Sequence, residues 1–209
     1  MSTTELLYGL SAAAANVVGA LAVTSGRRWS VTALDRTLAF TAGFLLSVAF
    51  VELMPEAIQR NGRAAAVTAL LAYLAVHLTQ HTIGRHFHFG EETHQVTPLV
   101  SRSALFGLML HTFVDGVAVA SGLLVSGTVG ALVFVGVLLH KFPEGLAISS
   151  LFLAAGAKRT TAVLAAGSLG MATLLGVALT DQLVSLQSYG LAISAGVTPS
   201  RVAAVRASR

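Results

Sequence analysis

Two short segments of the chain pair a histidine with a carboxylate at the same spacing. His111 stands four residues before Asp115, and His140 stands four residues before Glu144. In a helix, residues i and i+4 lie on one face, so each segment presents an imidazole and a carboxylate in the same direction. Two such faces opposite one another would make a four-ligand pocket. Imidazole and carboxylate ligands suit a divalent ion such as Zn²⁺, Fe²⁺ or Mn²⁺.

The two segments also match each other over a longer stretch than these pairs. At a constant offset, the following residues align: Phe113 with Phe142, Gly116 with Gly145, Ala118 with Ala147, and Ser121 with Ser150. A single pair could be an intrahelical hydrogen bond that makes polar groups tolerable in lipid. Two aligned pairs on consecutive helices favour a metal site. The chain has no cysteine, so any metal must be held by His, Asp and Glu.

The composition indicates that the helices carrying these pairs lie in a bilayer. Of the 209 residues, 55% are hydrophobic and only 11% are charged, which is less than half of the charged share of about 25% in soluble domains. We therefore predict an all-α, polytopic transmembrane helix bundle. Crossing a bilayer takes about 20 mostly apolar residues. Six predicted spans cover residues 6–24, 37–54 with an extension toward Ile58, 64–82, 103–125, 129–153 and 162–179, and a partial seventh follows.

The positions of the cations predict the orientation of the bundle, because short loops rich in Lys and Arg stay in the cytoplasm. The first, third and fifth connections hold Arg27, Arg28, Arg36, Arg85, Arg102, Lys158 and Arg159, whereas the second holds Arg60 and Arg63. This distribution places the N-terminus outside. Because the cations are dispersed along the chain, they do not indicate a nucleic-acid partner. The expected partners are the bilayer and a metal ion, and a homodimer is a further expectation.

On these residues the chain resembles the ZIP metal transporters. The fourth helix of that family carries His-Asn-x-x-Asp/Glu-Gly and the fifth carries His-x-x-Pro-Glu-Gly, where residues 111–116 here read His-Thr-Phe-Val-Asp-Gly and residues 140–145 read His-Lys-Phe-Pro-Glu-Gly. Residues 52–57, Glu-Leu-Met-Pro-Glu-Ala, resemble the end of the family's second helix. The resemblance implies that His111, Asp115, His140 and Glu144 line the transport site for a divalent metal entering the cytoplasm.

Two residues depart from the family pattern beside the predicted ligands. Thr112 stands where the family usually has Asn, and Lys141 stands where many members have a carboxylate or an amide. In the family these positions help to form a second metal site. The charge of Lys141 would disfavour a second cation, and its ammonium group could pair with Asp115 or Glu144 instead. We therefore expect one bound ion rather than two.

The predicted spans, together with this resemblance, divide the chain into two parts. Residues 1–182 are predicted to form a metal-transport bundle with a His-containing cytoplasmic loop at 83–102, and residues 183–209 an incomplete or irregular C-terminal segment. ZIP transporters typically have eight helices. Either another chain completes this bundle, or the chain is a truncated product with impaired function.

Weaker signals accompany this site. Glu52 and Glu56 form another i,i+4 pair, which is either the solvated end of a helix or an entrance that concentrates cations. His77 and His81 repeat the spacing, as histidines at the membrane boundary or as part of an exit route. The loop residues His86, His88 and His94 either bind Zn²⁺ weakly or are simply solvated. Asn16, a single polar residue in the first span, is expected to form a hydrogen bond between helices.

The leading hypothesis is a transporter in the plasma membrane that moves Zn²⁺ above all, or Fe²⁺ or Mn²⁺, into the cytoplasm. The metal is its substrate, and no organic cofactor is expected. One alternative is a membrane protein that binds metal without transporting it. A less favoured one is an intramembrane metalloprotease, which needs His-Glu-x-x-His, and that motif does not occur in the sequence. We therefore expect that the protein is not an enzyme.

Overall fold

The computed structural model describes residues 2–25, 36, 39–40, 43–44, 46–83, 97–183, 187 and 189–197. All regular structure within these residues is helical, which confirms the predicted all-α class. The elements are α1 (Thr3–Thr24), η1 (Ala49–Leu53), α3 (Met54–Asn61), α4 (Arg63–Ile83), α5 (Pro98–Val125), α6 (Gly127–Ala154) and α7 (Arg159–Gln182). Residues 189–197 are also helical.

Within the described residues, four helices are long and apolar enough to cross a membrane: Thr3–Thr24, Pro98–Val125, Gly127–Ala154 and Arg159–Thr180. They coincide with the predicted first, fourth, fifth and sixth spans. The predicted third span lies in α4, of which the stretch Arg63–Ala75 is described with its side chains and is apolar. The predicted second span lies partly outside the described residues, and its end forms η1 and α3. The full count of six spans and a partial seventh is not confirmed.

The predicted cytoplasmic loop at 83–102 ends earlier than expected, because α5 begins at Pro98. Thr97 caps the helix by accepting a hydrogen bond from the Val100 N–H on its side chain. Proline suits the first helical position, where its missing N–H would have no partner in any case. The Thr-Pro pair was thus a helix-start signal. His86, His88 and His94 lie outside the described residues.

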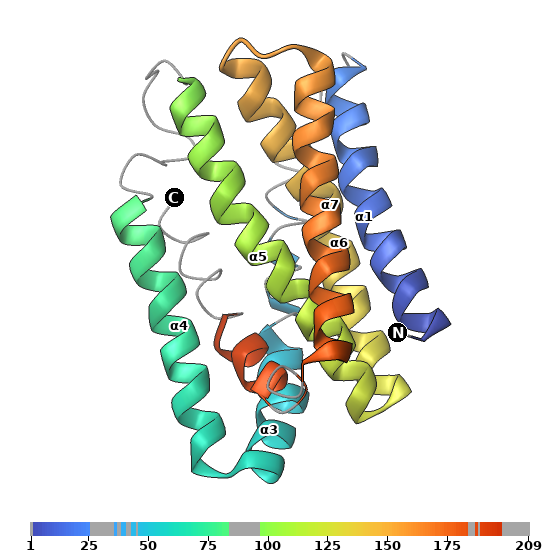
Figure 1. Cartoon of the computed structure of the whole chain (residues 1–209), viewed down its shortest axis with the longest axis vertical. Coiled ribbons are helices and arrows are strands. Elements are labelled where there is room, and N and C mark those ends of the chain that lie inside the picture. The colour runs from blue at the N-terminus through green and yellow to red at the C-terminus, as the bar shows by residue number, and fades with distance from the viewer. Residues whose placement is uncertain are drawn as a thin grey trace.

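The four spanning helices pack against one another. Figure 1 shows α5, α6, α7 and α1 side by side, with α4 on the opposite side of α5 from α1. The closest approaches occur at glycines, where a Cβ would overlap a carbonyl oxygen of the neighbouring helix: Gly116 meets Thr173, Gly176 meets Phe113, and Gly145 meets Asn16. Small residues allow helix backbones to touch in this way in membranes. These contacts lie beside the predicted metal ligands.

The C-terminal helical residues 189–197 lie between α5 and α4. A Cβ at Gly190 would overlap the Ser121 hydroxyl oxygen of α5, and one at Gly196 would overlap the Ala69 carbonyl oxygen of α4. Leu191 and Ala195 belong to an apolar core that also includes residues of α3, α4, α5 and α6. This segment therefore joins α4 to the spanning helices.

Candidate metal centre

A hairpin turn places the two histidine segments opposite each other. Ser126 is the only residue between α5 and α6, and it forms the C-cap of the first helix and the N-cap of the second. Its hydroxyl accepts a hydrogen bond from the Val129 N–H at 3.1 Å. Because the connection is so short, α5 and α6 must run side by side in opposite directions. The segment 111–115 therefore faces the segment 140–144.

Three of the four predicted ligands meet on these two helices. Asp115 Oδ2 lies 3.4 Å from His111 Nε2 on its own helix and 3.1 Å from His140 Nε2 on the facing helix. One ligand atom from each residue lies within 4.8 Å of the other two. Asp115 and His140 are buried, and His111 is partly buried. The i,i+4 spacing of His111 and Asp115 therefore does place both groups on one face of α5.

Glu144 lies outside this three-residue group, and Lys141 connects it to the group. The Lys141 ammonium Nζ lies 2.7 Å from Asp115 Oδ2 and 2.7 Å from Glu144 Oε2. Lys141 is completely buried, near the middle of α6. The sequence predicted a pairing with Asp115 or Glu144, whereas the structure shows both. A fixed positive charge thus stands between the two carboxylates of the predicted pocket.

The hydrogen bonds of His140 define which of its ring nitrogens carries the proton. Nδ1 lies 2.9 Å from the carbonyl oxygen of Gly136, one turn earlier on α6. A carbonyl only accepts, so Nδ1 must be the donor. In the neutral ring, Nε2 then carries a lone pair, and it points at the Asp115 carboxylate oxygen. Histidines that bind metals commonly donate their other ring N–H to a backbone carbonyl in this way.

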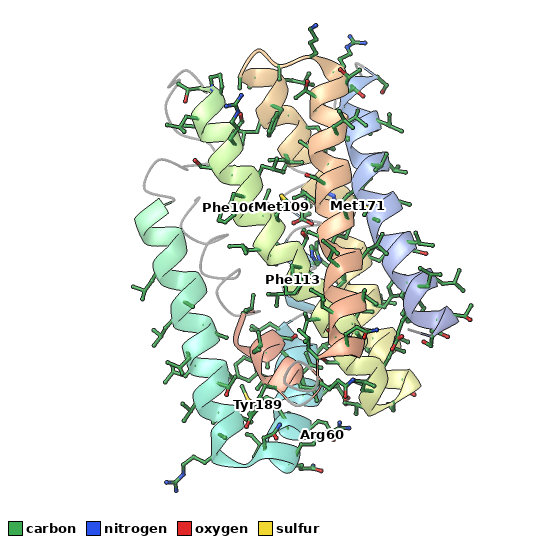
Figure 2. All side chains as sticks on the ribbon, in the orientation of Figure 1. Arg60, Phe106, Met109, Phe113, Met171 and Tyr189 are labelled. Carbon is green, nitrogen blue, oxygen red and sulfur yellow. The ribbon has the colours of Figure 1, made fainter. Side chains whose placement is uncertain are left out.

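Large apolar side chains also occur along α5 and α7, and two of them, Phe106 and Met171, are exposed. Figure 2 shows Phe106, Met109 and Phe113 along α5 and Met171 on the adjacent α7. Thr112 is fully buried, and its hydroxyl donates to the Met109 carbonyl oxygen at 3.1 Å. This bond within α5 explains how a hydroxyl is tolerated beside the predicted ligands.

The weaker candidate residues lie elsewhere. Glu56 forms an ion pair with Arg60, whose Nε lies 2.6 Å from its Oε1, as expected for a solvated helix end. Glu52 lies in the π-helical turn η1, just before Pro55, which cannot donate the backbone hydrogen bond that a regular helix needs there. His77 and His81 belong to α4, but their side chains lie outside the described part of the chain.

The predicted hydrogen bond of the Asn16 side chain to another helix is absent among the described residues. Neither side-chain atom, Oδ1 or Nδ2, has a partner within the described structure. Glu144 Oε1 is likewise buried with no partner among the described residues. No sequence signal could have indicated that these side-chain atoms lack partners, because their partners depend on how closely α1 and α6 approach.

The apolar spanning helices and the buried histidine–carboxylate group are those of a membrane protein that can hold a metal ion. A family model, that of the ZIP zinc transporters, matches residues 77–197, which is more than half of the chain. The chain therefore belongs to the ZIP zinc transporter family, and the predicted resemblance is confirmed. A comparison with curated protein sequences finds no match.

Family membership confirms the predicted membrane, transport and metal-binding character of the chain. It also fits the prediction that the chain is not an enzyme, because the family consists of transporters. The matched stretch contains α5, α6 and α7, and with them His111, Asp115, His140 and Glu144.

Proposed function

We propose that this chain carries one divalent transition-metal ion at a time into the cytoplasm, with Zn²⁺ as its main substrate and Fe²⁺ or Mn²⁺ as others. His111, Asp115 and His140 form the primary site between α5 and α6. Glu144 becomes the fourth ligand when the ion displaces Lys141 from it. Thr112, which is bonded to its own helix, contributes no ligand.

The contact between His140 and Asp115 carries this proposal. With Nδ1 donating to Gly136, the lone pair of Nε2 faces a carboxylate oxygen at 3.1 Å. Two acceptors repel at that distance unless a positive charge lies between them. That charge is either a proton on Nε2 or a metal ion. A divalent ion bound by both groups and by His111 resolves the contact, and the Gly136 carbonyl orients the ring for it.

The charges around the site support a single ion. Asp115 and Glu144 together carry two negative charges and Lys141 carries one positive charge, so the group has a net charge of −1 with neutral imidazoles. One divalent ion changes the net charge to +1, and a second would change it to +3. Burying so much unpaired charge inside a membrane is expensive. Lys141 thus replaces a second ion.

The loop charges support the proposed orientation. With the Lys and Arg residues of the first, third and fifth connections in the cytoplasm, the N-terminus lies outside, and the plasma membrane is the proposed location. Glu52 and Glu56 then lie near the outer face, where they could attract cations. His77 and His81, like the loop residues His86, His88 and His94, lie toward the cytoplasm on the exit side. We also propose that the chain forms a homodimer.

Uptake of radioactive zinc into proteoliposomes tests the proposal. The wild-type chain should accumulate zinc, whereas His111→Ala and Glu144→Ala should reduce the initial rate at least about tenfold, because ligand loss weakens binding at the site. Ser168→Ala is the control, because the Ser168 hydroxyl donates to the Ala165 carbonyl oxygen of its own helix and has no other partner among the described residues. Wild-type rates in both ligand variants would contradict the site. Zinc binding without uptake by the wild type would identify a metal-binding protein that does not transport.

A further inference from the structure

Asn16 is an unusual residue for the middle of a membrane helix. It is completely buried in α1, and neither its Oδ1 nor its Nδ2 has a hydrogen-bond partner among the described residues. A buried amide without hydrogen-bond partners is costly in an apolar environment. A polar side chain in this position within a membrane helix is by default a candidate for a functional role.

The position of Asn16 on α1 brings it to the predicted ligands of α6. A Cβ added to Gly145 would overlap the Asn16 carbonyl oxygen and would lie 2.8 Å from the Asn16 Cα. The two helices are therefore in backbone contact at this point. Glu144 is the adjacent residue, and neighbouring Cα atoms are about 3.8 Å apart. The Asn16 backbone therefore packs against α6 one residue away from Glu144.

The two side chains are also chemically complementary. Oε2 of Glu144 accepts a hydrogen bond from Lys141 at 2.7 Å, whereas its other oxygen, Oε1, is buried and unpartnered within the described structure. The Asn16 amide offers two N–H donors. A donor and an acceptor that both lack partners therefore stand on neighbouring residues of two contacting helices. Carboxylates that bind metals are themselves commonly held by such a hydrogen bond.

We propose that Asn16 is a positioning residue of the metal site, and that its side-chain N–H donates to Glu144 Oε1 when an ion takes this carboxylate away from Lys141. In the arrangement described above, Lys141 holds Glu144 Oε2 and Asp115 Oδ2, and Asn16 has no partner among the described residues. When the ion binds, the carboxylate turns and both groups gain a partner. This inference rests on the proposed function, because it assumes that Glu144 binds the ion.

A double-mutant cycle on zinc affinity tests the inference. The variants are Asn16→Ala, Glu144→Ala and the double variant, each purified as the full chain and titrated with Zn²⁺. Asn16→Ala should weaken zinc binding about tenfold, in line with the loss of an outer-shell partner. In the Glu144→Ala background, the same change should have no further effect. Asn16→Leu, which keeps the side-chain volume, should behave like Asn16→Ala.

A purely structural role for Asn16 gives a different pattern. It predicts that Asn16→Ala lowers the thermal midpoint of the ion-free protein and weakens zinc binding equally in both backgrounds, and that result would overturn the inference. So would unchanged affinity in Asn16→Ala. The proposed function fails separately, if the wild type binds no zinc or if His111→Ala leaves its affinity unchanged, and the inference would then fall with it.

Discussion

Replacing Lys141 with Met should make the stability of the protein depend on divalent metal. The side chain keeps its length but loses the ammonium group that lies 2.7 Å from both Asp115 and Glu144. Two buried carboxylates then remain without a cation between them. Removing one partner of a buried ion pair typically costs about 3–5 kcal/mol. Without metal, the variant should therefore unfold at a lower temperature than the wild type.

Zinc should reverse this loss and bind more tightly than in the wild type. The ammonium group repels an incoming cation, and two unit charges about 4 Å apart interact by about 4 kcal/mol at an effective dielectric constant of about 20. Since about 1.4 kcal/mol corresponds to a tenfold change in affinity, Lys141→Met should bind zinc at least about tenfold more tightly. A thermal unfolding series in detergent at increasing zinc concentration measures both effects.

Lys158→Met is the matched control for this series. Lys158 is exposed and lies immediately before α7, away from the buried carboxylates. Its replacement should leave the thermal midpoint and the zinc affinity unchanged. If Lys141→Met were as stable as the wild type without metal, and bound zinc no more tightly, the ammonium group would not be competing with the ion.

Asp115→Asn should nearly abolish zinc binding while preserving the shape of the side chain. A single oxygen of Asp115 is approached by His111, His140 and Lys141, so this carboxylate holds the group together. Asn removes the negative charge that both the ion and Lys141 need. The loss of affinity should exceed the roughly 10- to 100-fold that removal of an outer-shell partner causes. Isothermal titration with Zn²⁺ measures it.

Glu56→Gln separates this effect from a general loss of acidic residues. Glu56 pairs with Arg60 at the end of α3 and is partly exposed. Its replacement should leave equilibrium zinc binding unchanged. Equal losses in Glu56→Gln and Asp115→Asn would mean that zinc responds to the total charge of the chain, and not to a site between α5 and α6.

The predictable part of this fold is local. The apolar stretches gave the four spanning helices, and the i,i+4 spacing placed His111 beside Asp115. The pairing of Lys141 was also foreseeable, because a lysine in a span needs a carboxylate close by. The start of α5 was missed, although Thr97 and Pro98 form a recognisable helix start.

The remaining part depends on distances between helices, which spacing along one helix does not define. From the sequence alone, Glu144 and Asp115 were predicted to play the same role, because each follows a histidine by four residues. In the structure, Lys141 lies between them, so that only Asp115 joins the histidines. The unpartnered amide of Asn16 depends in the same way on the contact of α1 with Gly145. The way in which the helices pack against one another determines which ligands meet and which polar atoms lack partners, and this packing cannot be predicted from the helices one by one.

The number of zinc ions bound per chain tests the central claim most directly. Equilibrium dialysis of the purified chain, followed by metal analysis, should give one zinc ion per wild-type chain and none per chain of His140→Ala at the same free zinc concentration. Two ions on the wild type, or one ion retained with unchanged affinity by His140→Ala, would contradict a single site built on His111, Asp115 and His140.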